Sequence, residues 1–434
     1  MTPTKKYKAM MGSEFVRNSA KLLSAGVIAQ AIGILIYPIL TRIYAPEDFG
    51  LLNLFQSIAG VLIILSTAEY QYAILLPKED AQAKKCLHVG TTVLIGTFAL
   101  CALSIPFAQP IAQQFNAPEL ARWYWTLPLL VLFSGGWSLL NYWHTRNKNY
   151  TLASTYQISK SLLNAGLKWG LGIIGFIKGG LIIATVVSAI LSFLLNLARS
   201  MRKYKCRLAS LLPKPDKQTA VTYQNFPKFA LPRTLFNYVS ANLPFFLLTP
   251  FFGLEETGFF GMALTLAFTP ISLINGSIYQ VLFQQVSEKV NNKQSIIGTF
   301  RNFYRRVCLV VPPIGILLFI LLPFLTKLLL GEAWNTTADY IRMMLPWLFA
   351  SLLAGPTCFI TDIFMKQKET LYVEFTLLIV RAASLTYGIM THDIHVAILG
   401  FCGVTFLIFS AQVFWFYSIA KKYESTLPDK SEQA

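Results

Sequence analysis

Long apolar segments, separated by short polar breaks, run through almost the whole chain of 434 residues. Each is close to the roughly 20 residues that a helix needs to cross the hydrocarbon core of a bilayer. In lipid the backbone must satisfy its own polar groups, so such segments are expected to be helices. We predict twelve spanning helices, over residues 19–43, 50–76, 87–107, 123–143, 155–177, 181–198, 229–252, 258–283, 307–330, 343–365, 374–390 and 396–419.

The composition agrees with an all-helical integral membrane protein. Hydrophobic residues make up 54% of the chain and charged residues only 13%, about half the share of charged residues in a typical soluble domain. This excludes a disordered chain, a fibrous repeat and an ordinary soluble enzyme. The first apolar segment is longer than the core of a signal peptide, so we expect it to be an uncleaved membrane helix.

The basic residues predict how the helices are oriented. With the N-terminus in the cytoplasm, 27 of the 37 Lys and Arg residues fall in the cytoplasmic tails and loops, and at most four fall at the outer side, with Arg42 at the end of the first helix. Positively charged loops stay on the cytoplasmic side, so both termini are predicted to be cytoplasmic. The same distribution accounts for the net charge of +17 without a nucleic-acid partner, because the basic runs alternate with apolar spans.

The longest cytoplasmic loop divides the chain into two predicted bundles of six helices around a central cavity. The first bundle covers residues 19–198 and the second covers 229–419. They are joined by a basic linker, 199–228, and flanked by cytoplasmic tails at 1–18 and 420–434.

Short matching stretches suggest that the two halves are a repeat. Tyr44–Leu51 resembles Phe252–Phe259, which pairs Glu47 with Glu255 and Gly50 with Gly258, and Arg146-Asn147-Lys148 resembles Lys366-Gln367-Lys368. An even number of helices per half makes the repeat parallel, about an axis along the membrane normal. Chance similarity between short turns is the alternative.

Several charged residues lie inside the predicted spans, where an ionised group at the bilayer centre costs about 2.5–3.5 kcal/mol. Lys160, Asn164 and Lys168 are spaced by four residues, as are Arg233 and Asn237, so each set shares one helix face. We predict a basic, inward-opening chamber that binds an anionic substrate, with Asn164 and Asn237 as polar lining. Its cations are Lys21, Lys160, Lys168, Arg233 and Arg381. Snorkelling to the headgroups is an alternative for all five, and a stronger one for Lys21 and Arg233, which are near helix ends.

Three acids accompany these cations. Glu69 lies well inside the second predicted helix, and Asp362 and Glu374 lie nearer helix ends. A buried carboxylate among cations is a candidate for a counter-ion or a titrating coupling site. A structural ion pair is the alternative for Glu69.

No pattern indicates a catalytic, metal or cofactor site. Gly170–Gly175 has the spacing of a dinucleotide fingerprint, but it lies in an apolar helix without a preceding strand. There is no Walker A sequence, and His392-Asp393 with His395 is interpreted as a polar turn. The six cysteines are far apart and are expected to be free, buried thiols without a redox or metal role. We therefore expect a transporter without a cofactor rather than an enzyme.

Three stretches resemble the Wzx-type polysaccharide or O-antigen flippases. They are Leu40–Gly50, the end of the second predicted helix at Tyr72–Asp80, and the turn at Arg146–Tyr150. These belong to the multidrug/oligosaccharidyl-lipid/polysaccharide exporter superfamily. The resemblance implies a bacterial inner-membrane protein that moves repeat units linked to undecaprenyl diphosphate to the outer leaflet. It implies lipid-linked oligosaccharide and membrane lipids as partners, a polysaccharide polymerase and chain-length proteins as further ones, and, loosely, coupling to protons.

Three other functions compete with this one. A drug or cation antiporter of the same superfamily would need acids in its cavity, where this chain has an excess of bases. A lipid II flippase would have fourteen helices rather than twelve. A membrane enzyme such as a polymerase or ligase would need a large outer loop, and the longest outer breaks here are about 108–122 and 331–342.

Overall fold

The computed structural model describes residues 24–204 and 216–427, and all regular secondary structure in these two ranges is helical. Eight of the described helices are long and apolar enough to cross a membrane. The chain is therefore a multi-pass membrane protein. Two further helices, α8 (Leu127–Arg146) and α9 (Tyr150–Ile173), have spanning length but are not among these eight. The number of twelve spans stays a prediction.

The chain separates into two compact units. Unit 1 holds the described residues up to Tyr238 together with Gly253–Glu255, and unit 2 holds Val239–Phe252 and the described residues from Glu256 onward. Unit 1 therefore extends beyond the predicted linker at 199–228. The division falls within the long helix α12 (Leu231–Asn291), which is interrupted at Gly253.

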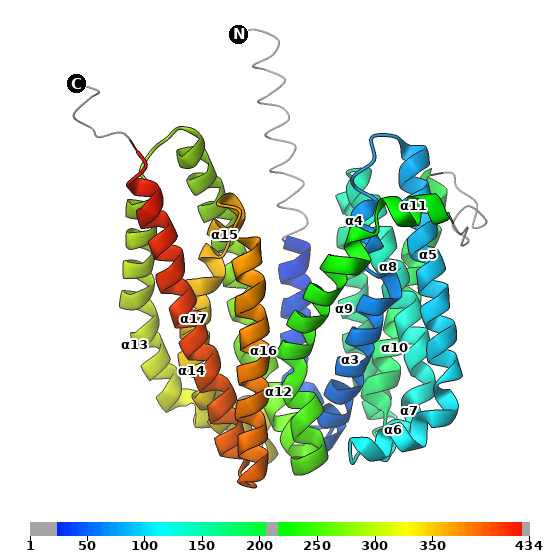
Figure 1. The fold of residues 1–434 in the computed structure, drawn as a ribbon. Coiled ribbons are helices and arrows are strands. Elements are labelled where there is room, and N and C mark those ends of the chain that lie inside the picture. Colours follow the sequence, from blue (N-terminus) through cyan, green and yellow to red (C-terminus); the bar gives the residue numbers. More distant parts are fainter. Residues whose placement is uncertain (1–23, 205–215, 428–434) are drawn as a thin grey trace. The chain divides into compact units, whose positions relative to one another are not determined.

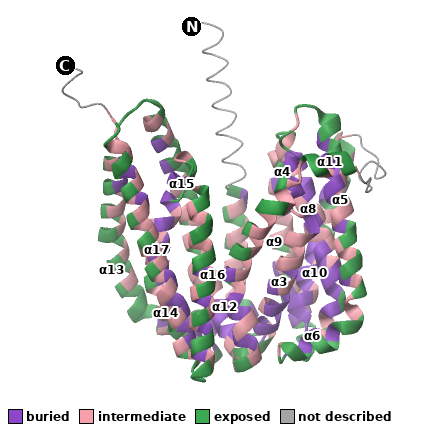
Figure 2. Ribbon diagram, in the orientation of Figure 1, coloured by how far each residue is buried: buried purple, intermediate pink, exposed green. Residues whose placement is uncertain are grey.

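In unit 1, α10 (Gly180–Tyr204) packs along α9, and α3 (Pro46–Thr67) and α5 (Asp80–Leu103) pack against α8 (Figure 1). Buried residues gather on α3 and α10 (Figure 2). The first described helix, Ser24–Leu40, ends in α2 (Tyr37–Leu40). The remaining elements are α4 (Tyr70–Ala73), η1 (Ile105–Phe107), α6 (Ala108–Gln114), α7 (Glu119–Trp123), η2 (Tyr124–Thr126), α11 (Lys217–Thr222) and the π-helix η4 (Phe226–Ala230).

In unit 2, α14 (Asn335–Ala354) and α16 (Gln367–Met390) both pack against α17 (Ile394–Glu424). Only 6% of the residues in the most apolar stretch of α13 (Ile297–Leu330) are buried. Figure 2 draws much of this helix in the colour of exposed residues. Because this surface consists mainly of aliphatic and aromatic side chains, it is suited to lipid. The short elements are η5 (Glu332–Trp334), η6 (Gly355–Thr357) and α15 (Ile360–Ile363).

Several predicted boundaries are wrong because polar helix ends do not differ from loops in hydropathy. The expected outer break at 331–342 is short, since α14 begins at Asn335 with the polar turn Asn335–Asp339. The predicted helix 343–365 agrees at its end with the candidate span Glu332–Ile363, in which η6 and α15 replace the α-helix after Ala354. In contrast, α13 begins at Ile297, ten residues before the apolar run, in a segment that carries Arg301, Arg305 and Arg306.

The repeat is visible in backbone geometry at the first pair of matching stretches. α3 follows Ala45, which is extended, and the second part of α12 follows Gly253 (φ 86°, ψ 175°). Each of these residues lies two positions before its paired glutamate, Glu47 or Glu255. The predicted pairing therefore agrees with where the helices begin.

The turns at the second pair of matching stretches share one helix-ending geometry. Lys148 and Met365 both have φ of 53°. In each turn the next backbone N–H donates to the carbonyl five residues earlier, from Asn149 to His144 at 2.8 Å and from Lys366 to Thr361 at 2.7 Å. The same combination recurs at Asn116, Lys293 and His392. It is therefore a common way for these helices to end, and the match between Lys148 and Lys368 stays a prediction.

Candidate functional site

The cation stripe of α9 is buried to an increasing degree along the helix. Lys160 is half-buried, with its Nζ 5.9 Å from the centre of the Tyr156 ring. Lys168 is 7% exposed, and its backbone carbonyl accepts a hydrogen bond of 2.7 Å from the Tyr44 hydroxyl. Among the described residues, no carboxylate and no hydrogen-bond acceptor pairs with the Lys168 ammonium. A buried, unpaired cation is costly, so this position favours an anion or water as its partner.

Glu69 lies where the second helix breaks. Ala68 (φ 42°) and Glu69 (φ 62°) are both left-handed and separate α3 from α4. For residues other than glycine each such conformation costs about 1–3 kcal/mol. The Glu69 carboxylate is 2% exposed, and it accepts hydrogen bonds from Gln71 Nε2, at 2.6 Å, and from Thr234.

Two irregular helical segments meet beside Glu69. α4 packs against the π-helix η4, with the rings of Tyr72 and Phe226 stacked at 6.2 Å. The positive charge of Arg233 acts on the Glu69 carboxylate. Such irregular helices often mark functional sites, and here both lie next to a buried acid in unit 1.

Arg381 of α16 lies in the interior of unit 2 and is 5% exposed. Its Nε donates to Thr405 Oγ1 at 2.9 Å and its Nη1 donates to Ser240 Oγ at 3.0 Å. The guanidinium carbon lies 4.8 Å from the centre of the Phe401 ring and 6.0 Å from that of Trp347. It forms no ion pair with any described carboxylate. Arg381 is thus hydrogen-bonded to neutral hydroxyls and packed against ring faces, while the negative charge of Glu374 also acts on it.

The other predicted site residues are less enclosed. Arg233 and Asn237 in unit 1 and Asp362 in unit 2 are exposed, and Glu374 is partly buried. Asn164 is partly buried, with its Oδ1 atom enclosed. Lys21 lies outside the described residues. The candidate residues described in unit 1 are therefore Glu69, Lys160, Asn164, Lys168, Arg233 and Asn237, and those in unit 2 are Asp362, Glu374 and Arg381.

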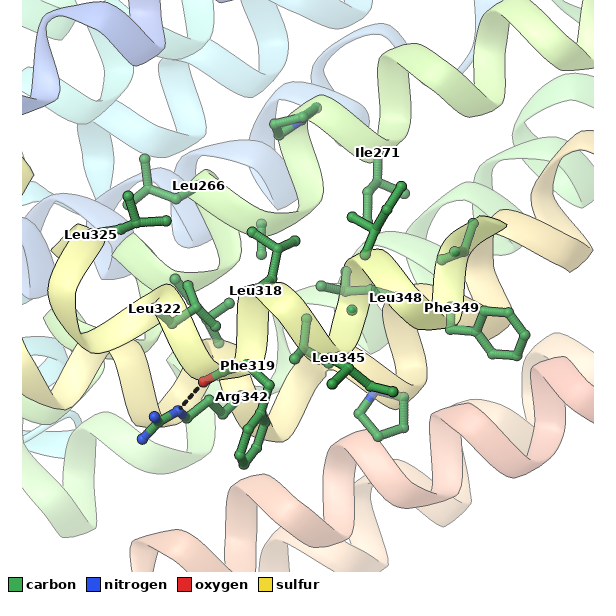
Figure 3. Close-up of a pocket in the computed structure, with 18 of the residues that line it drawn as sticks. Leu266, Ile271, Leu318, Phe319, Leu322, Leu325, Arg342, Leu345, Leu348 and Phe349 are labelled. Atoms are coloured by element: carbon green, nitrogen blue, oxygen red, sulfur yellow. Dashed lines mark hydrogen bonds between the residues drawn. The ribbon is translucent and has the colours of Figure 1, made fainter. Parts of the chain in front are cut away.

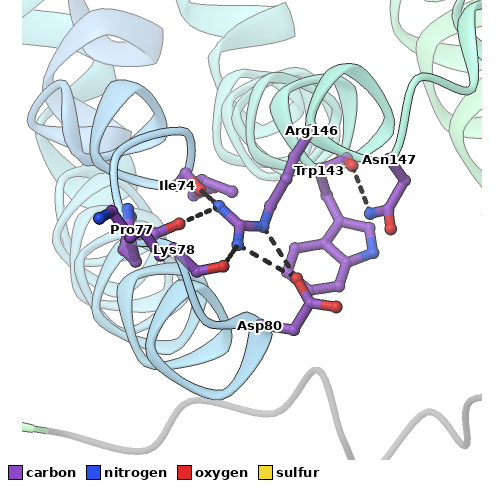
Figure 4. A network of polar contacts seen from close by, with 7 residues as sticks. All are labelled: Ile74, Pro77, Lys78, Asp80, Trp143, Arg146 and Asn147. Carbon is purple, nitrogen blue, oxygen red and sulfur yellow. Dashed lines mark hydrogen bonds and ion pairs between the residues drawn. The ribbon is translucent and has the colours of Figure 1, made fainter. Parts of the chain in front are cut away.

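Arg146 is an example of a basic residue with a purely structural role. Its guanidinium donates to the carbonyls of Ile74, Pro77 and Lys78 and to Asp80, as Figure 4 shows. These contacts use its planar set of donors to fasten the 74–80 loop to the end of α8. Arg146 is therefore not available to a substrate.

An apolar cavity of about 900 Å³ lies in unit 2 among α12, α13 and α14 (Figure 3). Its polar lining residues are Thr326 and Arg342. Arg342 Nε donates to the Phe319 carbonyl at 2.9 Å. This carbonyl lacks its usual helical hydrogen bond, because residue 323 is a proline and has no N–H to donate. Thr326 donates to Leu322. Since both polar side chains are engaged, this cavity is not suited to a sugar or a diphosphate.

The motifs interpreted as structural occupy structural positions. Asp393 caps α17 by accepting hydrogen bonds from the backbone N–H groups of His395 and Val396. Among the described residues no group of His, Cys, Asp and Glu could hold a metal ion. The five described cysteines are free thiols, but the expected burial is wrong for Cys308 and Cys358, which are exposed. Cys206 lies outside the described residues.

The partners of the buried charges were not foreseen from the sequence. Thr234, Ser240 and Thr405 carry hydroxyls on apolar helices, where isolated Ser and Thr residues are frequent and usually bond to their own backbone. Nothing in their spacing distinguishes them from the many other hydroxyl residues of the chain. Only the packing of helices distant in sequence selects them.

This architecture is that of known membrane transporters. A multidrug resistance MATE family transporter of the MOP superfamily, solved in an inward-facing conformation, matches with a TM-score of 0.72 and 12% identity, over 94% of this chain and 99% of that one. The lipid II flippase MurJ matches with a TM-score of 0.71 and 11% identity, over 94% and 90% of the two chains. At such identities the likeness shows the fold alone.

The sequence comparison identifies the family. Residues 39–339 match the family model described as polysaccharide biosynthesis protein, and the chain belongs to this family. The succinoglycan biosynthesis transport protein ExoT of Rhizobium meliloti (strain 1021) is 21% identical over 258 residues. That match covers 59% of this chain and 50% of ExoT, so the chain spans about half the length of that relative.

Proposed function

We propose that this chain is a flippase for undecaprenyl-diphosphate-linked oligosaccharide repeat units of the O-antigen or capsule type. It moves them by alternating access from the cytoplasmic to the outer leaflet of the bacterial inner membrane, with both termini in the cytoplasm. The observation that carries the proposal is the pair of buried cations, Lys168 and Arg381, neither of which has a carboxylate partner among the described residues. Membership of the polysaccharide biosynthesis family supports it.

The chemistry of the substrate fits these cations. A lipid-linked sugar combines a diphosphate, a polar oligosaccharide and a long apolar tail. A diphosphate supplies the negative charge that the cations lack, and charge-assisted hydrogen bonds to phosphate are stronger than neutral ones. Lys160, Lys168, Arg233 and Arg381 are proposed to hold the anion, with Lys21 at the entrance. Asn164 and Asn237 are proposed as polar lining.

Glu69 is proposed as the coupling or counter-ion site. Its carboxylate is buried, hydrogen-bonded and subject to the charge of Arg233, so gain or loss of a proton would change the interactions that hold α4. Glu374 and Asp362 are weaker candidates because they are more exposed. No cofactor or catalytic residue is needed, which makes the chain a transporter rather than an enzyme. A polysaccharide polymerase and chain-length proteins are the proposed functional partners.

A drug or cation antiporter is the second candidate, and the buried carboxylate of Glu69 is the observation that favours it. A cation substrate requires acids, and Glu69 is the buried acid of the described residues. The buried cations Lys168 and Arg381 weigh against it, because they would repel a cationic drug.

The test is complementation in bacterial strains that lack a polysaccharide flippase, with lipid-linked repeat units measured in everted membrane vesicles. We expect the chain to restore the surface polysaccharide and to remove the accumulated cytoplasmic-leaflet intermediate. If several polysaccharide backgrounds show no restoration while drug resistance rises, the antiporter is the correct assignment.

A further inference from the structure

The first described helix and α9 run side by side in the same direction within unit 1. Ser161 Oγ donates to the Ala29 carbonyl at 2.6 Å, and a Cβ atom placed on Gly26 would lie 3.9 Å from Gln157 Oε1. Further along, Tyr44 bonds to the backbone of Lys168. Residues 26, 29 and 44 therefore lie opposite 157, 161 and 168.

Three side-chain amides along this seam have buried oxygens without a hydrogen-bond partner. They are Gln30 Oε1, Gln157 Oε1 and Asn164 Oδ1. On α9, residues 157, 161, 164 and 168 share one face of the helix. At about 1.5 Å per residue, the 11 residues from Gln157 to Lys168 extend over roughly 16 Å. The seam is thus an extended polar strip rather than a single point.

The strip holds unmatched acceptors next to unmatched donors. The three amide oxygens need hydrogen-bond donors, and the ammonium of Lys168, 7% exposed, needs acceptors. Each buried polar group left without a partner costs about 1–3 kcal/mol. A protein seldom keeps several such groups together unless water or a ligand satisfies them.

The charges on the strip select the kind of ligand. A metal cation would suit amide oxygens, but Lys160 and Lys168 lie on the same helix and would repel it. An alkyl chain offers no donor. A group with many hydroxyls offers donors to the amides, and its oxygens accept from the lysines.

We propose that Gln30, Gln157 and Asn164 form a carbohydrate subsite, in which their amide oxygens accept hydrogen bonds from sugar hydroxyls of the transported lipid. The inference rests on the proposed flippase function and adds to it where the glycan is recognised. The amides act on the sugar, whereas Lys168 acts on the anion.

The test compares two lipids on the purified full-length chain in detergent, with binding measured by native mass spectrometry. One is undecaprenyl diphosphate, which has no sugar, and the other is the same lipid carrying the repeat unit of a complemented strain. We expect the wild type to bind the sugar-bearing lipid more tightly. Gln157→Leu and Gln30→Leu should each weaken binding of the sugar-bearing lipid by about fivefold, the effect of one lost neutral hydrogen bond. Binding of undecaprenyl diphosphate should be unchanged.

The controls separate the possible failures. Ser161→Ala removes a hydrogen bond within the same seam and should leave the ratio of the two affinities unchanged. Lys168→Met should weaken the binding of both lipids. If the leucine variants keep the wild-type ratio, the strip holds only water and the subsite is wrong. If the wild type binds neither lipid, the flippase proposal itself fails. Thermal unfolding of each variant identifies any that do not fold.

Discussion

Unit 1 and unit 2 each bury a cation inside a helix, but they surround it differently. Arg381 in unit 2 bonds to Ser240 and Thr405 and lies against two aromatic rings. Lys168 in unit 1 has none of these contacts among the described residues. A guanidinium is delocalised, weakly hydrated and rich in donors, so a neutral cage can hold it, whereas a compact ammonium keeps its demand for a strong partner. Arg381 therefore contributes to packing as well as to charge, while Lys168 is available to a ligand.

The largest effect on stability is expected from Arg381→Ala. The change leaves a cavity and two hydroxyls without their partner, so we expect the free energy of unfolding in detergent to fall by about 2–4 kcal/mol. Arg381→Lys should not restore it, because one ammonium cannot reproduce the planar donors and the ring contacts. Thr405→Val, which removes one bond, should cost less than Arg381→Ala. Wild-type stability in Arg381→Ala would show that the cage does not hold unit 2 together.

The next largest loss of stability is expected from Gly50→Ala. This variant tests whether close backbone packing, rather than charge, stabilises unit 1. A Cβ at residue 50 would lie 1.9 Å from the Leu254 carbonyl oxygen, so the backbone would have to move, at a cost of about 1–3 kcal/mol. Gly33→Ala is the matched control, because a Cβ there meets nothing within 4 Å and alanine favours a helix by about 1 kcal/mol. Thermal unfolding of both variants should shift in opposite directions.

A smaller difference is expected between the turn at Arg146 and the turn at Lys366. Arg146→Ala removes the side-chain bonds from Arg146 to the 74–80 loop and should cost about 1–2 kcal/mol. Lys366→Ala removes a bond to Glu369 in which both side chains are more than 40% exposed, and such pairs contribute about 0–1 kcal/mol. Proteolysis of the 74–80 loop should increase in the first variant only. Equal stability losses would mean that Lys366 has partners as important as those of Arg146.

The smallest effect on stability is expected from Lys168→Met. Removing an unpaired buried charge should leave the free energy of unfolding unchanged or raise it by about 1 kcal/mol, while transport of the lipid-linked repeat unit is lost. Thermal unfolding and the vesicle assay measure the two quantities separately. A strongly destabilised Lys168→Met variant would show that the ammonium has a structural partner and would remove the contrast with Arg381.

The two pairs of matched stretches show what residue matching can and cannot find. Glu47 and Glu255 each lie in the first turn of a helix, where acids are favoured by the helix dipole. Lys148 and Lys368 are matched by charge alone, and basic residues are favoured near the cytoplasmic face whatever the geometry of the turn. The positive φ of Lys148 does not identify its partner either, because Asn116, Lys293, Met365 and His392 share it.

The sequence by itself determined the helical class, the membrane setting and most of the segments, since hydropathy over 20 residues is a local property that the bilayer selects directly. It also identified the charges that are costly in a membrane. Only the tertiary structure decided which of them are buried, that Arg381 is caged, that helix two breaks at Glu69, and that Gln30 lies on the helix alongside Gln157 and Asn164. These depend on contacts between helices distant in sequence, and no local pattern specifies which side chain will face a given charge.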